Sequence, residues 1–414
     1  ASETGWPTST VSSNTSPAAT AALFNFHCQV NLGACIFGGG VPDKAKLAPH
    51  VLGYIAVQTT ALTYLDAPPQ PEEMLDTLTG TIRAVSQGGW AFNFGDGEPG
   101  GAVSLTNTAA VGSTGDYAAG LLAKSVGGTG VWSVNLGLFN LPVYTNGGAA
   151  GPVTVDNRAA ITTDGISSPA IAALSIGGLG VQGGRGGEVT VTTAGALTTS
   201  GSGAHGVLAE SIGGRSINDS PSVTGGVAGA VLVTVKSAIV TTGTKAYGVL
   251  ARSLGGEGSR GDSASGVDDS SNAGGRGGDS GAARIDISSG GAITTSGAGA
   301  HAVAGFSLGG QGGQGGGGNN AYAGATGGDG GLTGDVTLTN AGTLKTSGDR
   351  AYGMLGQSLT GKGGDGGDGD SIFVGQGGKG GASAPGGVIT MTNTGTIATQ
   401  GLDEGATKET EPKA

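Results

Sequence analysis

The sequence has few aromatic residues, few charges and no long apolar run. Aromatic residues make up 4% and charged residues 12% of the 414 residues. A chain with so few large side chains cannot build one ordinary globular core. No apolar run reaches the roughly 18 residues that a membrane-spanning helix needs, so we expect no transmembrane segment.

Basic residues are also scarce. Lys and Arg total 19 against 30 Asp and Glu, which gives a net charge of −11. This balance argues against nucleic acid as a partner, because nucleic-acid affinity comes largely from neutralising phosphates. An acidic surface rich in Thr, Ser, Asn and Gly is typical of exported proteins. The opening ASETGWPTSTVSSNTS resembles a mature terminus after cleavage at a small-residue site, so we expect export after removal of a signal peptide.

The two cysteines, Cys28 and Cys35, lie close together in HCQVNLGAC. In an exported protein this spacing favours a short-loop disulfide. A metal site would need further ligands, and only His27 is adjacent. A thioredoxin-type motif has two residues between its cysteines, whereas six separate these.

Glycine is abundant, at 91 residues, and it accompanies a repeat. Seven copies align on a glycine without insertion or deletion. They are VSLTNTAAVGSTG (103–115), VTVDNRAAITTDG (153–165), VTVTTAGALTTSG (189–201), VLVTVKSAIVTTG (231–243), IDISSGGAITTSG (285–297), VTLTNAGTLKTSG (336–348) and ITMTNTGTIATQG (389–401). The first six continue into a segment such as GSGAHGVLAESIGG, which contains a serine at a fixed distance from the glycine.

Apolar and polar residues alternate within each copy, so we expect strands. Three short strands and three turns in about 24 residues correspond to one coil of a parallel β-helix. The sequence therefore predicts an all-β fold, a β-solenoid of about seven coils. In the sixth coil we expect the buried side chains to be Val336, Leu338, Leu344, Met354 and Leu359.

Three regions follow from this pattern. Residues 1–100 lack the repeat and are expected to form a tail and an N-terminal cap over the open end of the stack, although LTGTIRAV (78–85) resembles a degenerate repeat unit. Residues 101–401 form the β-helix domain, and residues 402–414 a charged tail. Gly-rich connectors of unequal length leave every coil from the same corner. They are either mobile or lie side by side as polyproline-II-like strands with solvated backbones.

Two columns of side chains are candidates for function. The repeated serines Ser125, Ser175, Ser211, Ser253, Ser307 and Ser358 lack an adjacent base, so we interpret them as a hydroxyl ladder that closes a corner of the helix. Four positions after the glycine stand Ala119, Pro169, His205, Tyr247, His301 and Tyr352. The last four of these would form an outward His/Tyr strip, a speculative binding site for a sugar or a partner protein.

Catalytic and metal sites have weak support. β-Helix enzymes need carboxylates on neighbouring coils, whereas Glu210 stands between Leu174 and Arg252, so we expect no enzyme and no catalytic residue. GGDGGDGDSIFV offers Asp365, Asp368 and Asp370 as a possible calcium site; otherwise we expect no metal and no cofactor. Outward Thr-x-Thr pairs would suit ice binding only on an unbroken face, and Asp156 and Asp286 interrupt that face.

The segments GAHGVLAESIGG, KAYGVLARSLGG and RAYGMLGQSL, each followed by a Gly-rich tract and a copy of VTLTNAGTLKTSG, resemble the passenger repeats of bacterial autotransporter and related surface adhesins. The resemblance covers about residues 101–401. It implies a right-handed β-helix displayed at a Gram-negative surface, structural or adhesive rather than catalytic. No amphipathic barrel segment follows in this sequence, so we expect either a cleaved barrel or a secreted protein that assembles by itself.

These observations predict an extracellular structural or adhesive β-solenoid at a bacterial cell surface. Open coil ends pair by strand addition, so the expected partner is a second copy, in a head-to-tail oligomer or filament. A surface glycan or a host or neighbouring cell surface is a further candidate partner. The alternative function is a carbohydrate-active β-helix enzyme or a receptor-binding fibre, which a cluster of carboxylates on adjacent coils would favour.

Overall fold

The computed structural model describes residues 79–89, 95–135, 140–217, 222–264, 271–318, 323–369, 376–383 and 385–401. Regular structure in these residues consists of β-strands. No helix long and apolar enough to cross a membrane is found in this part of the chain. Cys28, Cys35 and Asp370 lie outside the described residues, so the predicted disulfide and one predicted calcium ligand stay predictions.

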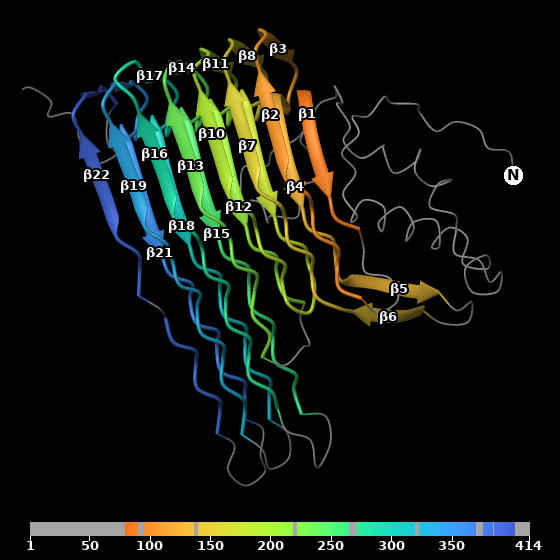
Figure 1. Cartoon of the computed structure of the whole chain (residues 1–414). Helices are drawn as coiled ribbons and strands as arrows, with labels where there is room; N and C mark the ends of the chain where they lie inside the picture. Colours follow the sequence, from red (N-terminus) through yellow and green to blue (C-terminus); the bar gives the residue numbers. More distant parts are fainter. Residues whose placement is uncertain are drawn as a thin grey trace, which may run out of the picture.

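Three parallel seven-stranded sheets form the body of the molecule (Figure 1). Sheet A contains β1 (Thr79–Gln87), β4 (Ala118–Val126), β9 (Ile171–Ile176), β12 (Val207–Ile212), β15 (Val249–Leu254), β18 (Val303–Leu308) and β21 (Met354–Leu359). Sheet B contains β2 (Val103–Asn107), β7 (Val153–Asn157), β10 (Val189–Thr193), β13 (Val231–Val235), β16 (Ala283–Ile287), β19 (Val336–Asn340) and β22 (Ile389–Asn393). Sheet C contains β3 (Val111–Thr114), β8 (Ile161–Asp164), β11 (Leu197–Ser200), β14 (Ala238–Thr241), β17 (Ala292–Thr295), β20 (Thr343–Thr346) and β23 (Thr396–Thr399).

The chain runs from sheet B to sheet C to sheet A in each of the first six coils and then returns to sheet B, and the seventh described coil contributes β22 and β23 to sheets B and C. Equivalent positions of the copies lie directly above one another: Val191 pairs with Val155 on one side and with Val233 on the other. The predicted parallel β-helix of about seven coils is confirmed. The gapless alignment of the copies is the register of the sheets except in the fifth copy, where it is wrong by two residues in sheet B: Val231 pairs with Ala283 and not with Ile285, because the turn between β16 and β17 is two residues longer than in the other coils.

Two elements lie outside the aligned copies. Strand β1 pairs in parallel with β4 through Thr79↔Ala118 to Gln87↔Val126, so the segment that resembles a degenerate repeat supplies a strand to sheet A. Strands β5 (Val131–Asn135) and β6 (Asn140–Tyr144) form an antiparallel hairpin in the first connector. The hairpin projects from the side of the stack in Figure 1.

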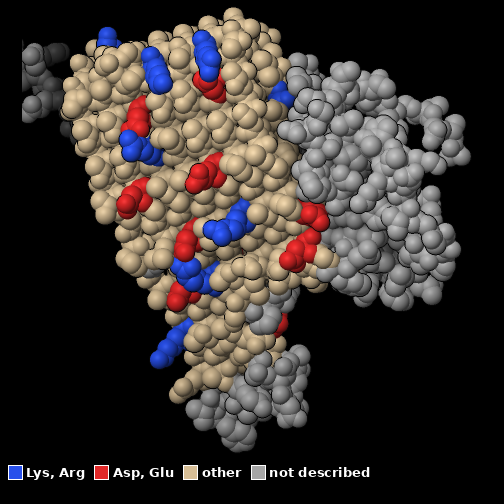
Figure 2. Space-filling model, in the orientation of Figure 1, with Lys and Arg blue, Asp and Glu red and all other residues tan. Residues whose placement is uncertain are grey.

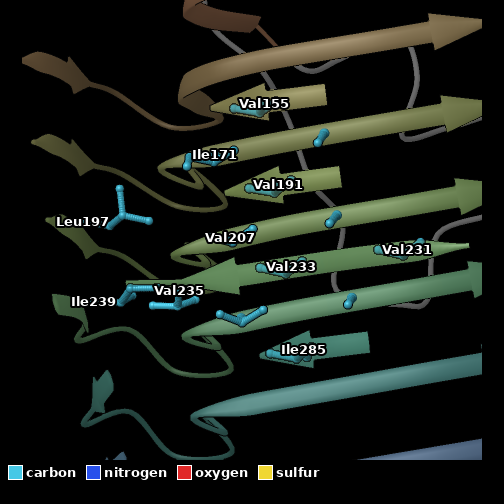
Figure 3. Close-up of a cluster of buried hydrophobic side chains, with 14 of the residues drawn as sticks. Val155, Ile171, Val191, Leu197, Val207, Val231, Val233, Val235, Ile239 and Ile285 are labelled. Carbon is cyan, nitrogen blue, oxygen red and sulfur yellow. The ribbon is translucent and has the colours of Figure 1, made fainter. Parts of the chain in front are cut away.

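The core is a continuous apolar column inside the solenoid (Figure 3). Strands of sheets B and C inside the stack alternate buried and more exposed residues, as in β7 and β8, because only one face meets the core. The last strands, β22 and β23, are exposed on both faces. Val336, Leu338 and Leu344 are buried as predicted, and Met354 packs against the same cluster. The prediction for Leu359 is wrong. Its position in sheet A points away from the core, and its side chain is 55% exposed.

The connectors form a second body, which we call the glycine bundle. Its outgoing arms begin after sheet A, at Gly127, Gly177, Gly213, Gly255, Gly309 and Thr360. Its return arms end before sheet B, at Ala102, Pro152, Glu188, Ala230, Ala282, Asp335 and Val388. Figure 1 shows the arms running in one direction away from the sheets, and they are longest in the later coils.

Hydrogen bonds within the glycine bundle recur every third residue. The amides of Gly255, Gly258 and Gly261 donate to the carbonyls of Leu308, Gln311 and Gln314 in the next outgoing arm. Side chains between these glycines, such as Glu257 and Arg260, are exposed. A three-residue period is that of a polyproline-II-like helix. The arms therefore lie side by side, which is one of the two predicted alternatives, but these backbone amides are bonded to neighbouring arms rather than solvated.

The outgoing and return arms are also bonded to each other. The Gly256 amide donates to the Gly226 carbonyl at 2.8 Å, and the Gly278 amide donates to the Gly256 carbonyl at 2.7 Å. This series of bonds continues along the stack from Glu98 to Gly361. The backbones approach so closely that a Cβ on Gly278 would lie 2.0 Å from the Gly226 carbonyl oxygen. Glycine is thus required here by space.

Candidate functional site

The predicted His/Tyr column exists as a stack of rings. The column lies just before the strands of sheet A, where each residue of one coil sits above its equivalent in the next. Ring centroids are 5.1 Å apart for His205 and Tyr247, 4.8 Å for Tyr247 and His301, and 5.0 Å for His301 and Tyr352. The structure therefore brings all four residues together into a single ladder.

Each histidine also accepts a backbone hydrogen bond from the next coil. The Tyr247 amide donates to His205 Nδ1 and the Tyr352 amide donates to His301 Nδ1, both at 3.0 Å. A neutral imidazole that accepts at Nδ1 carries its proton on Nε2. These bonds fix the ring orientation, and they exist only while the histidine is neutral.

Burial keeps both histidines neutral. His205 is 4% and His301 is 8% exposed. Burial, with a smaller contribution from the charge of Arg252, lowers the pKa of His205 to about 3. Burial also lowers the pKa of His301. Of the predicted outward strip, both histidines are thus buried at a covered corner of the coil, whereas Tyr352 is exposed; the binding role of the strip stays a prediction.

The ladder leaves little aromatic surface for a ligand. A sugar or a flat partner group binds an aromatic side chain over the ring face, but the stacking uses the faces between coils. Tyr352 ends the described ladder and is 49% exposed. If this column binds a ligand, Tyr352 is the residue that contacts it.

The repeated serines form a hydrogen-bonded ladder of another kind. Ser211 Oγ donates to the Gly187 carbonyl at 2.8 Å and accepts from the Gly229 amide at 2.7 Å. The same two bonds are made by Ser125, Ser175, Ser253, Ser307 and Ser358. Each serine ties the end of a sheet A strand to the base of two return arms. The serines thus take the structural role predicted from the sequence.

The carboxylate Glu210 lies between Leu174 and Arg252 in sheet A, as the repeat alignment indicates. Its side chain is fully buried, and Arg252 Nε donates to Oε1 at 2.6 Å. Its other oxygen, Oε2, is buried without a hydrogen-bond partner. A carboxylate with no exposed surface cannot reach a polymeric substrate, and its column neighbours are not carboxylates.

The predicted calcium ligands Asp365 and Asp368 lie on an outgoing arm of the glycine bundle. Both are exposed, and their carbonyls accept the amides of Gly315 and Gly318. Within the described ranges, no three His, Cys, Asp or Glu side chains are close enough together to hold a metal ion. The calcium prediction therefore gains no further ligand from this part of the chain.

Sequence reasoning missed one surface altogether. Strands of sheet A carry apolar residues on both faces, and a second apolar cluster, separate from the core, lies on the outward face. The signal was present in LLAKSV, IAALSI and VLAESI, where apolar residues fall at odd and even positions alike.

Comparison with known proteins adds no relative: no family model, no curated protein and no solved structure matches the chain. The fold and the ladders described above therefore carry the functional argument.

Proposed function

We propose that this chain is an extracellular structural or adhesive β-solenoid of a bacterial surface, able to act as a filament subunit. The observation that carries the proposal is the use of the repeated polar groups. Serine hydroxyls bond to glycine backbone groups of the arms, and buried threonines such as Thr199 and Thr241 donate to carbonyls of their own coil at 2.6 Å. Repeated hydroxyls that make hydrogen bonds to the backbone stiffen the fold rather than take part in catalysis.

The surface fits the same role. On the face that Figure 2 shows, Lys and Arg side chains are interspersed with Asp and Glu, and the described residues there form no basic patch. The net charge of −11 suits an exported protein that does not bind nucleic acid. The resemblance of the repeats to autotransporter-like adhesins supports the same localisation, with no family established.

The filament part of the proposal depends on the last described coil. Ile389 and Met391 in β22 and Ile397 in β23 continue core columns, yet they are 45%, 47% and 38% exposed. An exposed strand edge backed by apolar side chains is a template for strand addition. A second copy that adds its coils here would extend the solenoid head to tail.

The test is sedimentation and negative-stain electron microscopy of the purified chain. We expect oligomers or filaments for the wild type and reduced association for Met391→Lys, whose side chain points into the joint. The matched variant Thr390→Lys, on the opposite side of the same strand, should associate like the wild type. Compact monomers for all three proteins would refute self-assembly and leave adhesion to be tested alone.

A glycan-binding fibre is the second candidate, and the exposed ring of Tyr352 favours it. A glycan array probed with the wild type and with Tyr352→Ala tests this candidate. Loss of a specific signal in the variant would support it, whereas an array without any specific signal would exclude it. A carbohydrate-active enzyme is disfavoured by the complete burial of Glu210.

A further inference from the structure

The two ends of the stack are different parts of a coil. Each complete coil supplies one strand to sheet B, one to sheet C and then one to sheet A. Sheet A begins with β1, which no described strand of sheet B or C precedes. Sheets B and C end with β22 and β23, which no described strand of sheet A follows. One end therefore carries the third strand of a coil, and the other end carries the first two.

The register of β1 fits the open edge of β21. Ile82 of β1 pairs with Leu121 of β4, so it belongs to the inward column that ends at Met354 in β21. Strands β1 and β21 are the two edge strands of sheet A, and edge strands add strands from other chains. The residues from Thr81 to Ser86 are only half-buried, whereas their partners in β4 are buried. A second β1 placed on β21 would continue the columns of sheet A.

The serine ladder is incomplete at both ends. Ser86 pairs with Ser125 and accepts the Gly101 amide at 2.8 Å. The later serines also donate to a carbonyl of the preceding return arm, as Ser125 does to Gly101 at 2.9 Å. Among the described residues, no carbonyl accepts from Ser86 Oγ. At the other end, Gly387 donates its amide to Ser358 at 2.9 Å, and no described serine donates to its carbonyl. Each end thus lacks the group that the other end has.

The bases of the return arms are complementary in the same way. An amide here donates to a carbonyl of the next return arm, as Ala228 does to Asp279 at 2.9 Å. The equivalent amide in the last arm is that of Gly386, and the equivalent carbonyl in the first arm is that of Pro99. Both residues are exposed, and neither group has a hydrogen-bond partner within the described ranges. Farther along the last arm, Ser383 replaces a glycine, so the complementarity is confined to the arm bases.

The core side chains at the two ends are incompletely packed. Ile82 and Ala84, on the inward face of β1, are half-buried, and Met391 of β22 is 47% exposed. Within a complete coil, the positions of Ala84 and Met391 are occupied by Gly305 and Ile285. A Cβ on Gly305 would lie 3.9 Å from the Ile285 side chain. Adding β1 to β21 would therefore bring Ala84 of one copy against Met391 of the other.

We propose that β1 of a second copy pairs in parallel with β21, so that β22 and β23 of one copy and β1 of the next form one shared coil. Ser86 then lies beside Ser358, and Ser86 Oγ donates to the Gly387 carbonyl. Sheets B and C continue from β22 to β2 and from β23 to β3 of the second copy. The shared coil rests on the self-assembly proposed above, and it specifies the strands and the register of the joint.

A shared coil fixes the length that each copy adds to a filament. Every sheet receives seven strands from each copy, which at about 4.8 Å per strand gives an axial repeat of about 34 Å. If the two ends stacked without sharing a coil, β1 and the pair β22 and β23 would occupy separate layers. The repeat would then be about 38 Å. Electron cryomicroscopy of wild-type filaments separates these two values without any substitution.

A cysteine pair tests the register of the joint. Val85 of β1 belongs to the outward column that ends at Gln357 in β21. The two strands are opposite edges of sheet A, so cysteines at these positions cannot meet within one copy. In the shared coil their Cα atoms lie about 4.8 Å apart, within the range of a disulfide. Full-length Val85→Cys/Gln357→Cys should therefore form covalent multimers under mild oxidation.

The matched control moves one cysteine by two residues, to Leu355. Val85→Cys/Leu355→Cys should give about a tenth of the yield or less, because its Cα atoms are too far apart. Both variants retain Cys28 and Cys35, so mass spectrometry must identify the peptide linked through positions 85 and 357.

The outcomes separate the joint from self-assembly itself. The 85–357 link together with a repeat near 34 Å would support the shared coil. Oligomers without that link, equal yields from both cysteine pairs, or a repeat near 38 Å would overturn the shared coil and leave self-assembly standing. Wild-type protein that stays monomeric would refute both.

Discussion

The solenoid and the glycine bundle share the same coils but are held together by different groups. In the solenoid, side chains such as Leu197 and Ile239 fill a core, and the backbone follows in parallel sheets. In the bundle, few side chains lie between the arms, and backbone amides donate hydrogen bonds to carbonyls of neighbouring arms, for example at 2.7 Å from Gly278 to Gly256. A β-helix tolerates varied apolar residues, whereas glycine occupies most of the backbone contacts of the bundle. Backbone contacts between the arms account for the abundant glycine of the sequence, and a narrow core of aliphatic side chains accounts for its few aromatic residues.

The largest expected effect is the loss of a core side chain. Leu338 is fully buried between Ile285 and Met391 in sheet B. Leu338→Ala should lower the free energy of unfolding by about 2–5 kcal/mol, because it removes buried methyl groups and leaves a cavity. Urea unfolding measures the change. Thr337→Ala, one residue away on the outward face, should stay within about 0.5 kcal/mol of the wild type; an equal loss would contradict the assignment of faces.

A methyl group added to the glycine bundle should have the next largest effect. In Gly278→Ala the new Cβ would lie 2.0 Å from the Gly226 carbonyl oxygen, so two arms must separate. We expect a loss of about 1–3 kcal/mol and faster amide exchange in the neighbouring arms. Gly380→Ala is the matched control, since its Cβ meets nothing closer than 3.6 Å. Equal stability of the two variants would show that the arms are not closely packed.

Removing one serine tests the joint between the two regions. Ser211→Ala leaves the Gly187 carbonyl and the Gly229 amide without their partner, which should cost about 1–3 kcal/mol. Amide exchange should rise at the bases of the adjacent arms more than in sheet C. Ser200→Ala, which removes an exposed bond to Asp164, should have little effect. A uniform change across both regions would contradict the local role of the ladder.

At neutral pH the ring stack should show no change, but it should make the stability of the chain depend on pH. The pKa of His205 is lowered from 6.5 to about 3 in the folded chain, so the unfolded chain binds the extra proton between these values. The contribution of His205 to stability is fully present above pH 6.5 and falls by up to about 1.4 kcal/mol per pH unit as the pH drops towards 3. His205→Asn keeps an acceptor for the Tyr247 amide but does not titrate. Its unfolding free energy should depend less on pH in this window; identical pH profiles would refute the assignment.

Much of the fold was predictable because six of the seven copies align without gaps; only the fifth carries two extra residues, between β16 and β17. The positions of Val153, Val189 and Val231 in the repeat gave the sheet register directly. The serine ladder followed from the fixed spacing of serine and glycine, since stacking places equivalent residues above one another. The hydrogen-bonded state of the arms was less accessible, because a glycine tract has no side-chain pattern that distinguishes a packed helix from a mobile chain.

The errors have a common physical cause. Leu359 was predicted as a core residue and the two histidines as an outward strip, because the interpretation took the inside of the solenoid to be buried and its outside to be solvated. Sheet A is covered on both faces over much of its area, so its outward positions are apolar too. Leu174 and Leu208 carry the same hydrophobic signal as the core residues Ile171 and Val207. Only the three-dimensional arrangement separates the two clusters.

Amide hydrogen exchange of the native full-length chain tests the central claim most directly. The connectors should behave as a packed, hydrogen-bonded bundle. Gly256, Gly278 and Gly310, which bond in series, should therefore be protected to a degree comparable with strands β13 and β16. Exchange of these three amides at the rate of an unstructured peptide, with the strands still protected, would show that the solenoid stands alone and would contradict the account of the glycine bundle.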